Sequence, residues 1–185
     1  MFLNFKKIFQ KENQGFIFLV VGIFFISVYS VWRFHQLRIL SFRVSEYQEQ
    51  SKTGPIPAYI KMYPLGIDIQ IKEAAIVKDV WQVFPDAVSH LSSSTRIGEK
   101  GNMVLYGHNK NEVLGPIRWA KEGAIIELFD KAQNKYLYEV VKTDTVNPDK
   151  LSYILPTSEE TLTVYTCTGF LDNKRFVVVA KRVSK

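Results

Sequence analysis

The only cysteine of the chain, Cys167, follows a run of alternating apolar and polar residues from Thr161 to Thr166. Such alternation is typical of a half-buried strand. Thr168 and Gly169 come next and indicate a turn, so the thiol would lie at a strand end, where a barrel can present a side chain at its rim. A thiol there can act as a nucleophile if a cation or a base activates it. The alternative is a buried cysteine that serves as a small apolar side chain.

Three histidines could supply the base. His35 lies next to the apolar N-terminal segment and is implausible as an active-site group. His90 lies in the short segment 88–91, which we interpret as a loop or turn. The alternative for His90 is a structural role, with a partly buried ring that is hydrogen-bonded to the backbone. His108 follows Gly107 and the apolar run 103–106, which is a second strand end. Position therefore favours His108 as the partner of Cys167.

A third candidate, Arg175, follows the turn 171–174 and begins the β-branched run from Phe176 to Ala180. If this run pairs antiparallel with residues 161–166, the eight-residue separation returns Arg175 to the vicinity of Cys167. A guanidinium at that place can donate hydrogen bonds to an oxyanion or to substrate carbonyls. The alternative is a solvated turn arginine, which is what we expect of Arg182.

Short strands must position these three side chains, because the body of the chain has no long amphipathic helix. The hydrophobic pattern predicts strands at residues 67–71, 103–106, 124–129, 136–142, 161–166 and 176–180. Residues 124–129 and 136–142 would form a hairpin. Only short helices are expected, at residues 113–121 and within 148–159. Six or more short strands predict an all-β domain built as a closed or nearly closed β-barrel.

An uncharged apolar run occupies residues 16–32, with three basic residues on each side. Seventeen helical residues span about 26 Å, which is at the short end for a bilayer core. A cleaved signal peptide would have a shorter apolar region and small residues at its end, whereas this run ends in Val31 and Trp32. We therefore predict an uncleaved transmembrane signal anchor. The equal flanking charges do not decide its orientation.

The domain organisation follows from that anchor. We assign residues 1–15 to a cytoplasmic N-terminus, 16–32 to the membrane, 33–54 to a polar stalk and 55–185 to the folded domain, because residues 54–57 (Gly-Pro-Ile-Pro) break any helix. The net charge of +6 is concentrated in residues 1–54, which hold 7 basic and 3 acidic groups. The body lacks a basic block, which argues against nucleic-acid binding. A single cysteine excludes a disulfide framework and a multi-cysteine zinc site.

Taken together, these motifs resemble the sortase family. Residues 163–167 (Thr-Val-Tyr-Thr-Cys) are similar to the Thr-Leu-x-Thr-Cys strand of sortases, with Val164 in place of the usual Leu. Gly107-His108 is similar to the sortase histidine segment, and Arg175 matches the sortase arginine. The resemblance covers residues 56–183, in the order His, Cys, Arg, after an N-terminal anchor. Papain-like enzymes place Cys before His instead.

The resemblance implies a barrel of about eight strands and a membrane-anchored cysteine transpeptidase on the outside of a bacterial membrane. Cys167 would be the nucleophile, His108 the acid and base, and Arg175 the donor to the oxyanion. Substrates would be secreted proteins with a Leu-Pro-x-Thr-Gly-like sorting signal, and the acceptor an amine such as a cell-wall precursor or a pilin lysine. No metal or organic cofactor is required. Some sortases use calcium, and the acids to consider are Glu99, Glu112, Glu159 and Glu160, although scattered surface acids are usually solvated.

The resemblance also indicates where the signal would bind. Residues 146–160 correspond to the loop that covers the signal peptide in sortases, so Leu151, Ile154 and Leu155 are candidates for contact with a Leu-Pro pair, together with Thr166 of the cysteine motif. The alternative is that the three apolar residues only pack the loop onto the barrel. Two other functions stay open: an inactive sortase-fold module that binds a partner at the membrane, and a sortase that polymerises pilins.

Overall fold

The computed structural model describes residues 14–39, 41–42, 52–77 and 80–183. It divides into two compact units, Met1–Gln36 and Leu37–Lys185. The second unit begins well before residue 55, where we expected the folded domain to start. Ser41 and Phe42, which we expected in the stalk, therefore belong to the same unit as the β-barrel.

The first unit contains most of helix α1, Gln14–Ile39. Its apolar part, Gln14–Trp32, has a mean hydropathy of 2.3, and none of its side chains is buried. Nineteen residues rise about 28 Å, long enough to cross a bilayer core. A helix that is apolar on every side has no polar face to turn toward water. The helix includes the predicted segment 16–32 and continues beyond it to Ile39.

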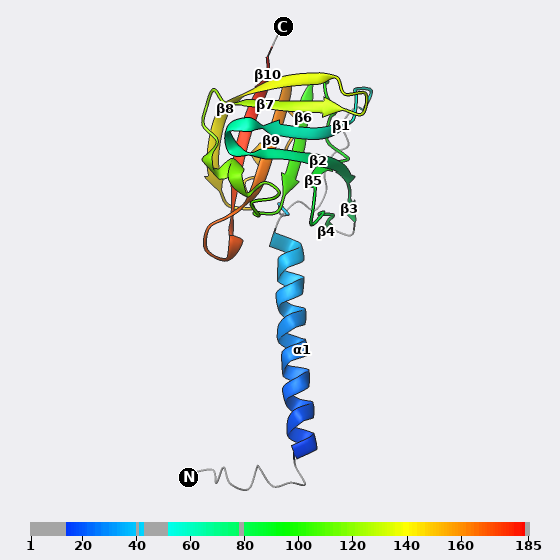
Figure 1. Cartoon of the computed structure of the whole chain (residues 1–185), viewed down its shortest axis with the longest axis vertical. Helices are drawn as coiled ribbons and strands as arrows, with labels where there is room; N and C mark the ends of the chain where they lie inside the picture. The colour runs from blue at the N-terminus through cyan, green and yellow to red at the C-terminus, as the bar shows by residue number, and fades with distance from the viewer. Residues whose placement is uncertain (1–13, 40, 43–51, 78–79, 184–185) are drawn as a thin grey trace. The chain divides into compact units, whose positions relative to one another are not determined.

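The second unit is a closed eight-stranded β-barrel, as expected. Around the barrel the strands follow the order β1-β2-β5-β6-β9-β10-β8-β7 (Figure 1). The strands are β1 (Pro57–Met62), β2 (Ile67–Ala74), β5 (Val88–Leu91), β6 (Gly101–Gly107), β7 (Ile125–Asp130), β8 (Lys135–Val146), β9 (Glu160–Thr168) and β10 (Lys174–Arg182). Closure satisfies the hydrogen-bonding groups of every strand and leaves no free edge.

All six predicted strands are confirmed, and β7 and β8 form the predicted hairpin. The sequence pattern did not predict two strands of the barrel, β1 and β5. β1 begins with a proline, and β5 has four residues that are all buried, so neither shows a clear alternation. A further small sheet pairs β3 (Ile76–Val77) with β4 (Val80–Trp81). The expected helix at residues 113–121 is the shorter 3₁₀ helix η4 (Gly115–Trp119), and η3 (Tyr63–Leu65), η5 (Leu151–Tyr153) and η6 (Phe170–Asp172) are also 3₁₀ turns.

Side chains alternate across the barrel wall and form two separate apolar clusters. On β9, Leu162 and Val164 belong to the cluster that fills the barrel interior. Tyr165 and Cys167 belong to a second cluster, which lies on the other face of β6, β9 and β10. Successive strand residues point to opposite faces, so this second cluster is on the outside of the wall. Cys167 therefore faces away from the barrel interior.

Candidate active site

Cys167 is the penultimate residue of β9 and is almost fully buried, with 2% of its surface exposed. Thr166 points the other way, toward the barrel interior, and its hydroxyl donates a hydrogen bond to the Gly107 carbonyl at 2.8 Å. This bond holds β9 to β6. The Thr166 side chain is fully buried. Contact of Thr166 with a substrate stays a prediction.

His108 lies beside Cys167 because β6 and β9 run parallel. Gly107 pairs with Thr166, so the next residues on the two strands are His108 and Cys167. His108 is the first residue after β6 and is partly exposed. The loop that follows folds back over the strand end: a Cβ at Gly107 would lie 3.0 Å from a Val113 methyl, and the Leu114 amide donates to the His108 carbonyl at 3.2 Å. The expected strand-end position of His108 is confirmed.

Arg175 pairs directly with Cys167 across the antiparallel strands β9 and β10, which confirms the predicted pairing. It is 2% exposed and is not a solvated turn residue. Its Nη1 donates to the carbonyls of Asp172 at 3.1 Å and Lys174 at 2.9 Å, and its Nη2 donates to the Ser41 carbonyl at 2.8 Å. Within the described residues its Nε is buried and has no hydrogen-bond partner. A buried N–H donor without an acceptor lowers the stability of the fold, unless another group accepts its hydrogen bond.

Arg182, which we expected to be solvated, is also partly buried. Its guanidinium lies 4.7 Å from the centre of the Tyr136 ring and 5.5 Å from that of Tyr138, and it approaches Glu160 at 3.7 Å. These contacts are at the far end of β10 from Arg175. The two arginines of this strand therefore have separate roles.

A strained turn between β9 and β10 positions Arg175. Gly169, Leu171 and Asp172 all have positive φ values, of 81°, 51° and 58°. Gly169 has φ 81° and ψ −177°, a backbone conformation that essentially only glycine adopts, so glycine is required there. Leu171 is unusual in this region of φ. The turn aims the Asp172 carbonyl at Arg175, while the Asp172 carboxylate accepts a bond from Asn109 Nδ2 at 3.4 Å and so links the arginine turn to the histidine loop.

Burial governs the protonation of the thiol. It raises the pKa of Cys167 to about 12, the positive charge of Arg175 acts to lower it, and the negative charge of Asp172 acts to raise it. Desolvation exceeds the effect of the guanidinium because the sulfur is shielded from water. In the arrangement described here, the thiol is protonated at neutral pH.

The segment between β8 and β9 covers the outer cluster that contains Cys167. Asn102, which is buried, donates from Nδ2 to the carbonyls of Tyr153 at 2.9 Å and Leu155 at 3.1 Å. Ile154 is fully buried in the cluster, Leu151 is packed against it, and Leu155 is 44% exposed. Leu151 and Ile154 thus do pack the loop onto the barrel. Contact of these residues and Leu155 with a substrate stays a prediction.

His90 lies in β5, not in a loop or turn, and its ring is fully buried. Nδ1 contacts the carboxylate of Glu73, and Nε2 contacts the Thr95 carbonyl at 3.0 Å. Both ring nitrogens face oxygen atoms, and the ring is held in place on both sides. His90 is therefore a structural residue, which leaves His108 as the histidine at the cysteine.

The structure also locates the acids considered for calcium. Glu99 accepts bonds from the amides of Gly54 and Arg96, Glu159 pairs with Lys181, and Glu160 accepts a bond from Tyr138; Glu112 is exposed. Within the described ranges, no three His, Cys, Asp or Glu side chains are grouped as a metal site would require. The roles of calcium and of other cofactors stay predictions.

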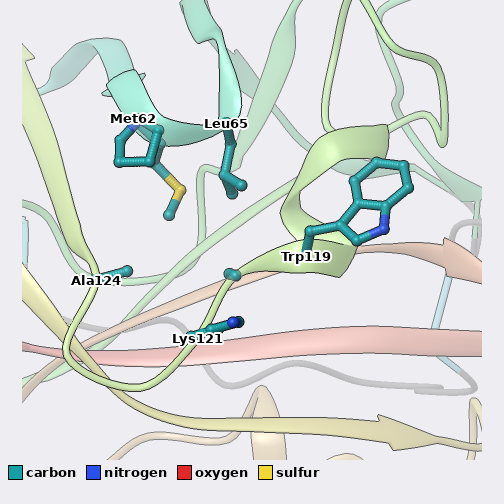
Figure 2. Close-up of a pocket in the computed structure, with 7 residues that line it drawn as sticks. Met62, Leu65, Trp119, Lys121 and Ala124 are labelled. Carbon is teal, nitrogen blue, oxygen red and sulfur yellow. The ribbon is translucent and has the colours of Figure 1, made fainter.

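An apolar pocket of about 350 Å³ opens beside η3 and η4, as Figure 2 shows. Met62, Leu65, Trp119, Lys121 and Ala124 line it together with Pro64 and Ala120. None of His108, Cys167 and Arg175 belongs to its lining. The pocket is therefore separate from the site around the cysteine.

Two residues at the cysteine were missed in the sequence, Ser41 and Phe42. The Ser41 carbonyl accepts the Arg175 bond, and Phe42 is 2% exposed with its ring edge-on to Tyr165 at 4.9 Å between centroids. The sequence feature that could have identified Phe42 was an aromatic side chain in a mostly polar stretch. Such a residue gains most when it packs against a folded domain.

Comparison with known proteins agrees with this architecture. The sortase domain model matches residues 60–183, which is more than half of the chain. The chain therefore belongs to the sortase family. Sortase A of Listeria monocytogenes is 35% identical over 92 residues, which is 48% of this chain and 41% of that protein, so the match spans less than half of the relative.

Solved structures of sortases share the fold. Sortase C1 of Streptococcus agalactiae superposes with a TM-score of 0.61 at 23% identity, over 72% of this chain and 69% of that one. A sortase D5 transpeptidase of Clostridium perfringens gives a TM-score of 0.59 at 24% identity, over 75% and 83% of the two chains. At such identities the likeness establishes the barrel fold alone.

Proposed function

We propose that this protein is a cysteine transpeptidase that cleaves a C-terminal sorting signal of secreted proteins and transfers the acyl part to an amine, which attaches those proteins to the cell surface. The observation that carries the proposal is the placement of Cys167 between His108 on one neighbouring strand and Arg175 on the other. A nucleophile needs a base and an oxyanion donor within reach, and the strand register brings one candidate for each role close to Cys167.

In the first half of the reaction the Cys167 sulfur, as thiolate, attacks the scissile carbonyl carbon and a carbon–sulfur bond forms. The negative charge moves to the carbonyl oxygen, where Arg175 donates hydrogen bonds; its unpaired Nε is suited to this role. The carbon–nitrogen bond then breaks. His108, which begins the step as an imidazolium, gives its proton to the leaving amine, and a thioester on Cys167 remains.

In the second half an incoming amine attacks the thioester carbonyl. His108, now neutral, takes a proton from the amine, the carbon–sulfur bond breaks, and the thiolate of Cys167 is restored beside the imidazolium. The product is a new amide, and no electrons are exchanged with an outside partner. The acceptor class we propose is a primary amine of a cell-wall precursor or of a pilin lysine.

The substrate class we propose is a peptide with a Leu-Pro-x-Thr-Gly-like core, cut between Thr and Gly. The apolar outer cluster that ends at Cys167 supports an apolar residue upstream of the scissile bond. To test the function, the full-length protein in detergent is mixed with quenched fluorescent peptides of this core and with triglycine. We expect cleavage and a triglycine adduct that both disappear in Cys167→Ala. A folded wild-type protein that cleaves no peptide of the panel would favour an inactive binding module.

We further propose that the barrel lies outside the cytoplasm, with α1 as its anchor. Because Cys167 is buried, a more exposed reporter is needed. Cys167→Ala combined with Lys131→Cys places one thiol in the exposed β7–β8 turn. We expect a membrane-impermeant maleimide to label this thiol on intact cells after wall digestion. Labelling only after the membrane is permeabilised would overturn the orientation.

A further inference from the structure

The turn between β9 and β10 carries the two most exposed large apolar side chains in the described part of the second unit. Phe170 is 82% exposed and Leu171 is 70% exposed. The turn, drawn in orange in Figure 1, extends beyond the ends of the neighbouring strands. Adjacent apolar side chains at such a tip lose free energy to water, and they mark a surface that contacts something outside the barrel.

The fold presents these side chains in a fixed conformation. Leu171 lies at the tip with φ at 51°, a region that residues with a Cβ rarely adopt. The Asp172 amide donates to the Gly169 carbonyl at 3.2 Å, and Arg175 Nη1 donates to the Asp172 carbonyl at 3.1 Å. The outward direction of the apolar pair is therefore maintained at a conformational cost.

The same turn lies where the chain enters the barrel after α1. One guanidinium joins the two segments, because Arg175 Nη1 bonds the Asp172 carbonyl of the turn while Nη2 bonds the Ser41 carbonyl at 2.8 Å. The apolar part of α1 ends at Trp32, nine residues before Ser41. Nine residues reach at most about 30 Å when fully extended, and the helical course up to Ile39 shortens this reach. Chain length alone therefore keeps this end of the barrel near a membrane crossed by α1.

The composition of the tip suits the boundary between lipid headgroups and acyl chains. Aromatic and aliphatic side chains enter this layer, and a lysine beside them meets the phosphates. Lys174 is exposed, and its Cγ would lie 3.4 Å from a Cβ placed at Gly169, so its stem runs beside the tip. The carboxylate of Asp172 is only partly exposed and accepts a hydrogen bond from Asn109 at 3.4 Å. The exposed charge within the turn is thus positive.

We propose that Phe170 and Leu171 insert into the headgroup–acyl boundary of the membrane that α1 crosses, and so hold the Cys167 end of the barrel on the lipid surface. The proposal rests on α1 as the anchor, but not on the chemistry of Cys167 or on the side of the membrane that the barrel occupies. The tether gives the tip a high effective concentration at the lipid. Burial of the two side chains then favours the docked form by roughly tenfold or more.

The test measures the depth of a label beside the tip, in the full-length protein reconstituted in vesicles of phosphatidylcholine and phosphatidylglycerol. Cys167→Ala with Asn173→Cys leaves one thiol, on the exposed side of the turn, for a nitrobenzoxadiazole fluorophore. We expect lipids that carry a nitroxide near the headgroup to quench it. The same label at Lys131→Cys should not be quenched. That residue lies at the other end of the barrel, because Arg175 pairs with Val146 at the end of β8 that is far from the β7–β8 turn.

Phe170→Ser combined with Leu171→Asn removes the apolar pair and keeps the turn, because asparagine tolerates a positive φ. Quenching of the Asn173 label should fall by roughly half or more, since the bias toward the docked form is lost. Phe170→Ser alone should fall between this variant and the parent. Tyr59→Ser is the matched control: it removes an exposed apolar side chain that pairs with Phe129, next to the far turn, and should leave quenching unchanged. Equal quenching with and without the apolar pair would overturn the proposal.

Flotation of the protein with the vesicles separates the anchor from the tip. Protein that does not float has no anchor in α1, and the proposal fails with it. Protein that floats while the label on the turn stays in water refutes the insertion alone. If the apolar pair is then also needed for peptide cleavage in detergent, with Cys167 restored, the tip contacts the peptide and not the lipid. The label reports insertion in a protein without the thiol, so its result does not depend on the proposed function.

Discussion

Arg175 lies directly opposite Cys167 in the antiparallel pairing of β9 and β10, and both side chains are almost completely buried. A buried guanidinium needs several acceptors, and among the described residues this one has three backbone carbonyls on its two Nη atoms and no partner for Nε. The pairing fixes the position of the charge relative to the sulfur.

The environments of the two histidines predict opposite outcomes for His108→Ala and His90→Ala. Loss of His108 should reduce kcat/KM by several orders of magnitude, because it removes both the charge partner and the acid and base, each about 10²–10⁴-fold. His90→Ala should lower stability but leave the activity of the folded fraction close to that of wild type. Peptide cleavage normalised to folded protein measures the difference. A folded His90→Ala variant as inactive as His108→Ala would reverse the assignment.

Arg175→Lys separates directed hydrogen bonds from charge. Lysine keeps the positive charge but lacks the planar set of donors. Loss of one oxyanion donor costs about 10²–10³ in rate, so we expect a fall of at least about tenfold in kcat/KM with the fold retained. Arg118→Lys is the control, since Arg118 stacks on Trp119 in η4. Near-wild-type kinetics for Arg175→Lys would reduce this residue to a background charge.

Asp172→Asn should lower the pKa of the Cys167 thiol. The Asp172 carboxylate raises that pKa, and asparagine removes the charge while it tolerates the positive φ of this position. The pH dependence of alkylation measures the shift. Asp86→Asn, which changes an exposed partner of Lys72 elsewhere on the barrel, should leave the profile in place. An apparent pKa that rises in Asp172→Asn would contradict the electrostatic account.

Glu73→Gln should make the barrel less stable at neutral pH but not at low pH. Burial raises the pKa of Glu73, but the hydrogen bond and charge of His90 outweigh it, so the pKa is lowered in the fold. Stability from this pair is therefore present above the ordinary carboxyl pKa and lost as the pH falls through the lowered one. Since Glu73 is partly exposed, we expect a loss of about 1 kcal/mol, or about 2–4 °C in Tm.

Thermal melts of wild type and Glu73→Gln between pH 3 and pH 8 measure this loss. The difference in Tm should be largest above pH 5 and should shrink toward pH 3. A difference that grows as the pH falls would have the wrong sign for a carboxylate stabilised by His90.

The strands that carry the site could be predicted from local residue patterns. Residues 161–166 of β9 alternate, and residues 176–180 of β10 form a β-branched apolar run. The short turn between the two strands indicates antiparallel pairing, so the approach of Arg175 to Cys167 follows from local sequence. β1 and β5 could not be predicted in this way. β1 begins with a proline, and burial on both faces removes the alternation from β5.

The contacts that Ser41 and Phe42 make beside Cys167 could not be predicted from the sequence. Ser41 is 134 residues from Arg175, and its interaction uses a backbone carbonyl, which every residue has. In the sequence, Phe42 differs from its neighbours only as an apolar residue in a polar stretch. The contact between Glu73 and His90 depends in the same way on the parallel pairing of β2 and β5, which local patterns do not encode.

The most direct test of the central claim is the intact mass of the full-length protein after incubation with a Leu-Pro-x-Thr-Gly peptide and no amine acceptor, quenched in acid. We expect an added mass equal to the peptide up to its Thr, held as a thioester on Cys167 and removed by hydroxylamine. Cys167→Ala should form none of it. Cleavage of the peptide by wild type without any such adduct, together with turnover retained in Cys167→Ala, would contradict catalysis through the cysteine.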